Sequence, residues 1–247
     1  MSCQQPIPGL SFSPEPGIHA LILKISDILE RDLPRAVSPD YRGMRHLEFH
    51  PDDFSRDVFS EKEILSLNRF RALKKQVEWI SGRIALKSLV NRVIRPDLPM
   101  NQLDVSYREK GAPFITSLPQ VPISLSHSGN YTAAVLSEDP GQVLGIDLER
   151  IGPCPGSGFL ETAFSPREIR RMEVRAQDIF RNWTLKEAFL KYIQMGFNES
   201  LHRVEIINGR IFHNGRLQDI RSWSQILEKE YMLSLVWRSI SQKQRNK

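Results

Sequence analysis

Apolar residues recur along this chain with two periods, one typical of helices and one typical of strands. The helical period extends over residues 73–94, ahead of Pro96, and appears again over residues 183–192. Shorter apolar runs predict strands at residues 20–25, 105–107, 114–116, 123–125, 131–136, 143–148, 204–207, 211–212 and 231–237. Helices and strands mixed in this way predict an α+β fold. Residues 1–17, which are rich in proline, and residues 40–53, which are polar and basic, are expected to be irregular.

Several features repeat in the same order in the two halves of the chain. Phe59–Ile64 and Phe164–Ile169 each place a serine three residues before a glutamate, the pattern of a helix capping box. They lie 105 positions apart, and Trp79 and Trp183 lie 104 apart, with Trp183 expected to open the second long helix. Self-similarity at one offset predicts two copies of one α+β unit, related by a pseudo-twofold, with the active site in the cleft between them. The turn at residues 137–141 divides the chain into halves at 1–138 and 139–247.

Composition narrows the class of protein. The 247 residues are 40% hydrophobic and 26% charged, as in ordinary globular proteins. We expect a cytoplasmic protein, because the sequence has no membrane-length apolar run, no evident secretory signal, and only Cys3 and Cys154 as cysteines. The formal net charge of +5 is compatible with nucleic acid, a polyphosphate cofactor or an acidic protein as partner, and does not choose between them.

Two acidic motifs are candidates for chemistry. Asp147 and Glu149 lie two positions apart in a predicted strand, so their side chains point to the same side. Paired carboxylates at a strand end provide the oxygen ligands that magnesium prefers. Glu187 and Lys191 are four positions apart on the second helix and share a face. On spacing alone, solvated acids and a surface salt bridge are the favoured interpretation of these two motifs.

Basic and polar residues form a second set of candidates. Ser126 and His127 end an alternating strand in a polar turn, and both side chains can donate hydrogen bonds to a phosphate. A histidine in such a turn equally often bonds its own backbone. Lys75 and Arg83 share a face of the first long helix, and Lys110 precedes a tight turn. On spacing alone, a solvated basic face is the favoured interpretation of these three residues.

Taken together, these motifs resemble the 4′-phosphopantetheinyl transferase superfamily, in its long, two-half, Sfp-type branch. The resemblance rests on the Ser126–Gly129 turn, the Gly145–Glu149 strand, Phe164-Ser165 with Glu168, and the Trp183–Lys191 helix, and it extends from about residue 59 to residue 236. It implies a magnesium-dependent enzyme that moves the phosphopantetheine arm of coenzyme A onto a serine of an apo acyl or peptidyl carrier protein, releasing 3′,5′-ADP.

The resemblance also implies a role for each candidate residue. Asp147, Glu149 and Glu187 would bind magnesium together with the diphosphate of coenzyme A, and Glu187 would act as the base. Lys191 would bind the cofactor and assist the departing 3′,5′-ADP, and Lys186 would have a supporting role. The other cofactor-binding residues would be Lys75, Arg83, Lys110, Ser126 and His127. The chain departs from the family pattern at Ala112, where a lysine is common, and at Gly196–Asn198, where two glycines are common.

Two other functions are alternatives to this one. A magnesium-dependent phosphodiesterase could use the same acids on a nucleotide-type substrate. A non-enzymatic, basic nucleic-acid-binding protein would need a continuous basic face with aromatic residues, whereas the basic residues here are scattered among acids. The expected partners are therefore a carrier protein and coenzyme A, without nucleic acid or membrane. A monomer is expected, because an internal repeat removes the need for a dimer to form one site.

Overall fold

The computed structural model describes residues 9–32, 46, 48–49 and 55–238. The loop predicted at residues 40–53 lies outside the described residues, apart from 46, 48 and 49. Within the described part, the helices are α1 (Ile25–Asp32), α2 (Ser55–Val58), α3 (Glu61–Leu67), α4 (Leu73–Val93), α5 (Ser157–Ala163), α6 (Pro166–Ile169) and α7 (Ala176–Tyr192), with short 3-10 turns at Met100–Gln102, Gly196–Asn198 and Leu201–Arg203.

The strands form four sheets: a four-stranded sheet, a three-stranded sheet of long strands, a three-stranded sheet of short strands, and a two-stranded hairpin. We call the first two the larger sheets. One larger sheet has the order β1-β2-β6-β5 and the other the order β11-β12-β7. Their strands are β1 (Leu10–Glu15), β2 (Ile18–Lys24), β5 (Ile123–Ser128), β6 (Tyr131–Ser137), β7 (Leu144–Arg150), β11 (Arg221–Leu227) and β12 (Tyr231–Trp237). The smaller sheets pair β3 (Val105–Tyr107) with β4 (Pro113–Ile115), and β8 (Val204–Ile207) with β9 (Arg210–His213) and β10 (Arg216–Leu217). The α+β class predicted from the sequence is confirmed.

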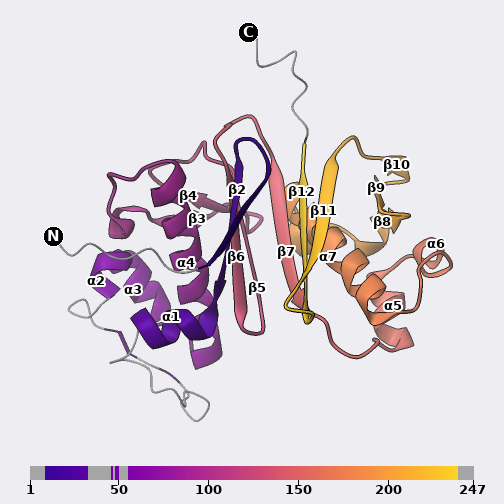
Figure 1. Cartoon of the computed structure of the whole chain (residues 1–247), viewed down its shortest axis with the longest axis horizontal. Coiled ribbons are helices and arrows are strands. Elements are labelled where there is room, and N and C mark those ends of the chain that lie inside the picture. The colour runs from indigo at the N-terminus through magenta and orange to yellow at the C-terminus, as the bar shows by residue number, and fades with distance from the viewer. Residues whose placement is uncertain (1–8, 33–45, 47, 50–54, 239–247) are drawn as a thin grey trace, which may run out of the picture.

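The two larger sheets lie between the two long helices, so that the molecule has four layers (Figure 1). Side chains alternate along each strand, which gives every central strand two buried faces. On β2, Leu21 and Leu23 pack toward α4, whereas Ala20 and Ile22 pack against β7 and β12. Helix α7 covers the far face of the second sheet. The chain passes from one sheet to the other at residues 137–141, where the sequence predicted a turn.

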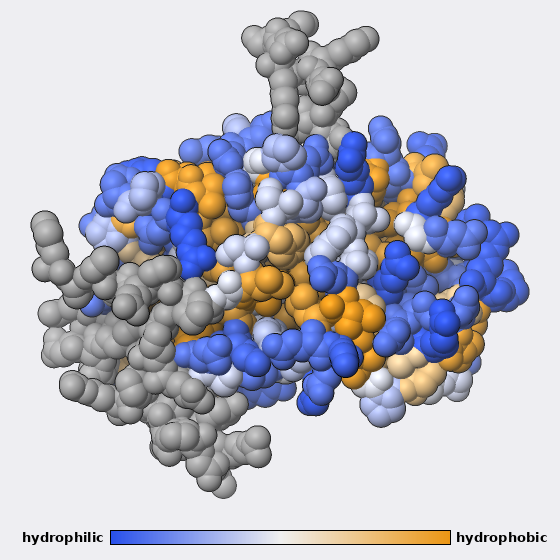
Figure 2. Space-filling model, viewed as in Figure 1, coloured by the Kyte–Doolittle hydropathy of each residue, from blue (hydrophilic) through white to orange (hydrophobic). Residues whose placement is uncertain are grey.

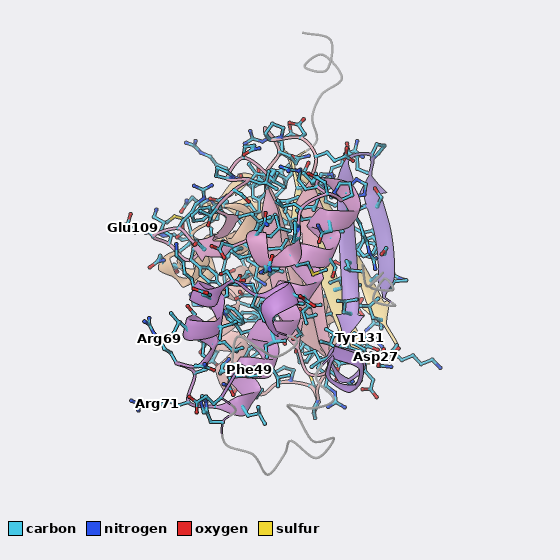
Figure 3. All side chains as sticks on the ribbon, turned by 90° about the vertical axis from the view of Figure 1, so that its left-hand side faces the viewer. Asp27, Phe49, Arg69, Arg71, Glu109 and Tyr131 are labelled. Atoms are coloured by element: carbon cyan, nitrogen blue, oxygen red, sulfur yellow. The ribbon has the colours of Figure 1, made fainter. Side chains whose placement is uncertain are left out.

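The surface in Figure 2 shows hydrophobic residues gathered near the middle of this face, where the two sheets lie next to each other in Figure 1. Phe12 on β1 and Trp223 on β11 contribute to this contact, with ring centroids 4.8 Å apart, and both pack against the core between the sheets. From the side of the first half, Arg69, Arg71 and Glu109 point outward (Figure 3). No helix in the described ranges is long and apolar enough to cross a membrane.

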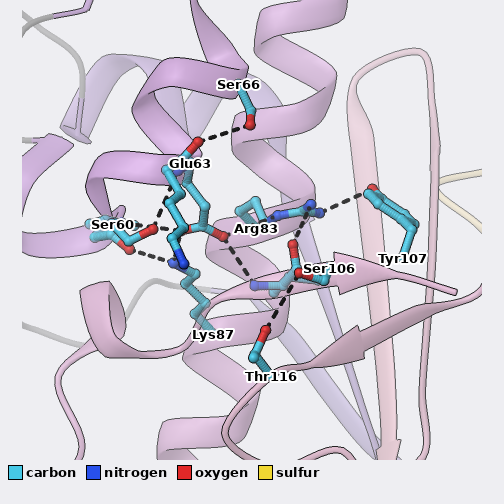
Figure 4. Close-up of polar contacts among 11 residues, drawn as sticks. Ser60, Glu63, Ser66, Arg83, Lys87, Ser106, Tyr107 and Thr116 are labelled. Carbon is cyan, nitrogen blue, oxygen red and sulfur yellow. Dashed lines mark hydrogen bonds and ion pairs between the residues drawn. The ribbon is translucent and has the colours of Figure 1, made fainter.

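Glu63 is the centre of a buried network in the first half (Figure 4). Ser60 and Glu63 form a capping box at the start of α3, as their spacing predicted. The Glu63 carboxylate also pairs with Lys87 of α4 and accepts a hydrogen bond from the Val105 backbone N–H at 3.3 Å. The Lys87 ammonium group in turn donates to the Val58 carbonyl at 2.7 Å.

The second half contains a network with the same connections. Ser165 and Glu168 form the capping box of α6, and Glu168 accepts from the Ile206 N–H at 2.8 Å. Lys186 of α7 donates to Glu168 at 2.8 Å and to the Ala163 carbonyl at 2.7 Å. Each half therefore fixes the start of a short helix, a long helix and a strand at one buried carboxylate. The pseudo-twofold relation and the 138/139 division remain predictions.

Two expectations about the fold are wrong. Residues 10–15, expected to be irregular, form the edge strand β1. Pro14 is compatible with this position because an edge strand leaves one row of N–H groups unpaired, and the register shifts between Phe12 and Glu15. Helix α7 begins at Ala176, so Trp183 lies within it and does not open it. Ala176, Ile179, Phe180 and Trp183 recur at helical spacing, so the signal for the earlier start was present in the sequence.

Candidate active site

A cleft of about 500 Å³ lies where α4, β5, β7 and α7 meet, a volume suited to a small ligand. The sequence placed nine residues in one functional site, and the structure brings all nine to the lining of this cleft: Lys75, Arg83, Lys110, Ser126, His127, Asp147, Glu149, Glu187 and Lys191. They come from both predicted halves and from five separate segments. The acidic wall of the cleft consists of Asp147, Glu149 and Glu187. The remaining residues are the lysines and a group of more buried side chains that are held by contacts within the protein.

The acidic wall is built by β7 and α7. Strand alternation directs Asp147 and Glu149 to the face of β7 that α7 covers. The helix lies unusually close to the strand at Gly145: a Cβ placed there would be 2.1 Å from the Ala188 carbonyl oxygen. This close approach places Glu187, one residue before Ala188, over the two acids of the strand.

Asp147 is 4% exposed and its two carboxylate oxygens have different surroundings. The Oδ1 atom accepts hydrogen bonds from the Lys191 ammonium group at 2.7 Å and from the Ser126 hydroxyl at 2.9 Å. The Oδ2 atom is buried without a hydrogen-bond partner. A buried carboxylate oxygen without a partner is costly, which indicates a position where a cation or donor is missing.

Burial also raises the pKa of the other two acids, Glu149 and Glu187. Burial raises the pKa of Glu149, and the hydrogen bond from Ser128 at 2.8 Å opposes that rise. Burial, and next the negative charge of Asp147, raises the pKa of Glu187 to about 7. The Oε1 atom of Glu187 is likewise buried without a partner. Three carboxylates so close together repel one another, and a bound cation would relieve that repulsion.

The donor chemistry of this wall fits magnesium, which prefers carboxylate oxygens. Asp147 Oδ2 and Glu187 Oε1 are the two oxygens that such an ion would satisfy. Within the described ranges, however, no three His, Cys, Asp or Glu side chains stand as a ready-formed metal-binding group. In this arrangement the Lys191 ammonium group compensates Asp147 in place of a metal ion.

The two lysines of the α7 motif have different surroundings. Lys191 points into the cleft, and its ion pair is formed with Asp147 and not with Glu187, four positions before it. Lys186 is fully buried on another side of the helix, in the ion pair with Glu168. Five positions at about 100° each place Lys191 about 140° around the helix from Lys186, which explains why the two point in different directions. Lys186 supports the fold and does not line the cleft.

The predicted cations on the opposite wall are held by different partners. Lys75 pairs with Glu78 at 2.9 Å and keeps most of its side chain exposed. Lys110 is exposed, and its ammonium group lies 3.0 Å from the sulfur of Met195, so it reaches across to the other half. Arg83 is only 3% exposed. Its guanidinium group stacks over Trp79 and lies 3.3 Å from the Glu63 carboxylate, so it is an anchored residue of the wall.

Ser126 and His127 face different neighbours, as adjacent strand residues do. The Ser126 hydroxyl is buried against β7, where it accepts from the Leu148 N–H at 3.1 Å and donates to Asp147. The His127 ring lies toward α4, with Nδ1 4.0 Å from Glu78. Burial lowers the pKa of His127, Glu78 raises it, and Lys191 lowers it further. At neutral pH the ring is therefore uncharged and able to donate and accept.

Sequence reasoning missed Glu78 and three aromatic residues of the cleft. Glu78 lies between Lys75 and His127, and Phe70, Trp79 and Tyr107 line the wall near it. The spacing of three between Lys75 and Glu78 on one helix was the available signal for Glu78. Tyr107 is more than half exposed, and its contribution depends on the position of β3 next to Arg83.

Comparison with known proteins agrees with the resemblance found from these motifs. Residues 143–236 match the model of the 4′-phosphopantetheinyl transferase superfamily, and this segment contains Asp147, Glu149, Glu187 and Lys191. The resemblance is confirmed over those residues.

Curated relatives match over a larger part of the chain. The 4′-phosphopantetheinyl transferase ffp of Bacillus subtilis is 28% identical over 136 residues, 52% of this chain and 58% of that protein. A putative 4′-phosphopantetheinyl transferase of Synechocystis is 29% identical over 157 residues, 60% of this chain and 61% of that protein. The L-aminoadipate-semialdehyde dehydrogenase-phosphopantetheinyl transferase of Xenopus laevis is 27% identical over 144 residues, which are 51% of this chain and 46% of that protein. The chain therefore spans about half to three fifths of these relatives.

Proposed function

We propose that this chain moves the phosphopantetheine arm of coenzyme A onto a serine of an apo carrier protein. The resemblance of residues 143–236 to the 4′-phosphopantetheinyl transferase superfamily supports this proposal. The observation that carries the proposal is the cleft itself, where three carboxylates, two of them with unpaired buried oxygens, face Lys75 and Lys110. A diphosphate with bound magnesium has the charges that such a pair of walls would hold. The expected partners are coenzyme A and an acyl or peptidyl carrier protein.

The reaction is a phosphoryl transfer, in which positioning and charge neutralisation dominate. The serine oxygen forms a bond to the phosphorus that carries pantetheine, and the bond from that phosphorus to 3′,5′-ADP breaks with its electron pair on the leaving group. The serine proton passes to Glu187, directly or through a water molecule, as the general base. Lys191 stabilises the leaving phosphate, and Lys75 and Lys110 bind the phosphates of coenzyme A.

Asp147, Glu149 and Glu187 would hold magnesium. The bound ion would neutralise the charge that develops on the diphosphate. Arg83 contributes by keeping Trp79 and Tyr107 in place, because its buried guanidinium group lies against both rings and beside Glu63. The exposed half of His127 remains available to a phosphate oxygen.

The test is intact-protein mass spectrometry of an apo acyl carrier protein incubated with the full chain, coenzyme A and magnesium. We expect a mass gain equal to the phosphopantetheine arm, lost with EDTA and lost in Asp147→Ala. The matched control is Asp97→Ala, since Asp97 is an exposed acid that pairs with Arg95 far from the cleft. Release of free phosphopantetheine without a gain on the carrier would replace transfer by hydrolysis. Full activity of Asp147→Ala would contradict the role given to the acidic wall.

A further inference from the structure

The two larger sheets meet along a row of three serines. Strands β5 and β7 are edge strands of different sheets, yet they lie side by side and run in the same direction. Every second residue of β5 is a serine, at positions 124, 126 and 128, and we call these three residues the serine row. Each hydroxyl of the row accepts a backbone N–H from β7, as a carbonyl would do in a continuous sheet.

The row keeps one register along its whole length. The acceptors Ser124, Ser126 and Ser128 take the N–H groups of Ile146, Leu148 and Arg150 at 3.2, 3.1 and 3.0 Å, and each pair is separated by 22 positions. A serine hydroxyl has one proton and two lone pairs. Accepting the N–H uses a lone pair and leaves the proton to be donated elsewhere.

Two of the three hydroxyls donate that proton to an acid of the candidate site. Ser126 donates to Asp147 Oδ1 at 2.9 Å, and Ser128 donates to Glu149 Oε2 at 2.8 Å, each across 21 positions. The same register places Ser124 opposite Gly145, which has no side chain to receive a proton. The row thus contains two members that contact acids and one that makes only the contact between sheets.

We propose that Ser126 and Ser128 are positioning residues, which orient Asp147 and Glu149 for metal binding through hydroxyls that β7 itself holds in place. The direction of each chain of bonds is fixed, because the N–H can only donate and the ionised carboxylate can only accept. Bonds arranged in series polarise one another, so each acid is held more firmly than by a freely rotating hydroxyl. The inference rests on the proposed function and deepens it.

The geometry also explains which oxygens remain for a cation. At Asp147 the hydroxyl and Lys191 both use Oδ1, so Oδ2 is left without a partner. A group that orients a metal ligand without touching the metal changes metal affinity when it is removed, typically by about 10-fold to 100-fold. The cofactor contact predicted for Ser126 stays a prediction, and its hydroxyl donates to Asp147.

The experiment measures binding of Mn²⁺ to the full chain by electron paramagnetic resonance, in wild type and in Ser124→Ala, Ser126→Ala and Ser128→Ala. All three substitutions remove one N–H acceptor, and Ser126→Ala and Ser128→Ala also remove a donor to an acid, so urea unfolding measures separately how far each variant is destabilised. We expect Ser126→Ala and Ser128→Ala to weaken Mn²⁺ binding about 10-fold, and Ser124→Ala to leave it within twofold of wild type. Ser128→Thr, which keeps the hydroxyl, should restore the wild-type affinity.

Equal Mn²⁺ affinities in all three alanine variants would overturn the inference, whether all are weakened or none is. Failure of Ser128→Thr to bind better than Ser128→Ala would do the same. The proposed function is tested separately by the wild-type chain. A wild type that modifies the carrier while its serine variants bind Mn²⁺ normally overturns the positioning role alone, whereas a wild type that neither binds Mn²⁺ nor modifies the carrier overturns both.

Discussion

The ammonium nitrogen of Lys191 on α7 lies 2.7 Å from Oδ1 of Asp147 on β7, and it also donates to the Ile146 carbonyl at 2.9 Å. The lysine side chain is 29% exposed and the aspartate side chain 6%. A nearly buried carboxylate is therefore balanced by a lysine that still reaches the cleft. The pair joins the helix and the strand that form the acidic wall.

Lys191→Met should destabilise the metal-free protein by about 1–2 kcal/mol, because it leaves a buried carboxylate without its charged donor. Magnesium should stabilise the variant more than the wild type, since the ion no longer competes with the lysine for Asp147. Urea unfolding in EDTA and in excess magnesium measures both effects. Lys24→Met is the control, because the Lys24–Glu228 pair is exposed and should matter little. Equal gains from magnesium in variant and wild type would contradict the competition.

Glu187 gives the stability of the metal-free protein a definite dependence on pH. Its folded pKa is raised from 4.5 to about 7 by burial, and next by Asp147. The folded state therefore binds the proton more tightly than the unfolded state, and its contribution to stability is complete below pH 4.5 and is lost as pH rises through 7. The loss should be about 3 kcal/mol, since each pKa unit corresponds to about 1.4 kcal/mol.

Glu187→Gln removes this titration, so the variant should be more stable than wild type above pH 7 and the difference should vanish near pH 4.5. Thermal or urea unfolding of both proteins in EDTA across this range measures the difference. The free energy of unfolding of the wild type is subtracted from that of the variant because a second group also titrates. Burial lowers the pKa of His127, so its contribution to the stability of the protein is lost as pH falls. A difference that does not change with pH would show that Glu187 titrates normally.

Gly145→Ala should be strongly destabilising, by about 3 kcal/mol or more. The added Cβ would stand 2.1 Å from the Ala188 oxygen and 2.5 Å from the Tyr192 nitrogen, and both are backbone atoms that cannot rotate away. The matched control is Gly82→Ala within α4, where the nearest atom outside the helix, Thr132 Oγ1, is 4.0 Å from the added Cβ. Removing that helical glycine should stabilise by about 0.5–1 kcal/mol. Chemical unfolding of the two variants should move in opposite directions.

Lys186→Met should destabilise the chain by about 3–5 kcal/mol, because it leaves Glu168 as a buried charge without a partner. Lys87→Met should cost less, because Arg83 still lies 3.3 Å from the Glu63 carboxylate. The double variant Glu168→Gln/Lys186→Met should recover part of the loss, since Gln is neutral and keeps an oxygen for the Ile206 N–H. Urea unfolding midpoints test this order, and a double variant less stable than Lys186→Met would contradict it.

The sequence was most informative where one period extends over a whole element or where a cap has a fixed spacing. Residues 231–237 were predicted as a strand and form β12, and the Ser60–Glu63 spacing predicted the start of α3. Strand β11 was missed, because its serines, Trp223 and Gln225 give an edge strand little apolar alternation. Edge strands such as β1 and β11 are stabilised by their neighbours more than by their own composition.

The residues of the candidate site were found from their chemistry, whereas their partners were not. Asp147, Glu149 and Glu187 could be grouped by spacing and resemblance. That Lys191 pairs with Asp147, and that Arg83 lies beside Glu63, depends on how α7 and α4 pack, which no local spacing encodes. The regular register between β5 and β7 is likewise a relation between two separate sheets.

The serine row has a consequence for how this architecture can change over generations. Backbone hydrogen bonds are the same whatever the residues, so the spacing of strands within a sheet offers little for selection to act on. The contact between β5 and β7 instead depends on three side chains, each of which a single substitution can change. Such a substitution alters how the edges of the two sheets meet, while the apolar core between the sheets and the pairing within each sheet stay in place.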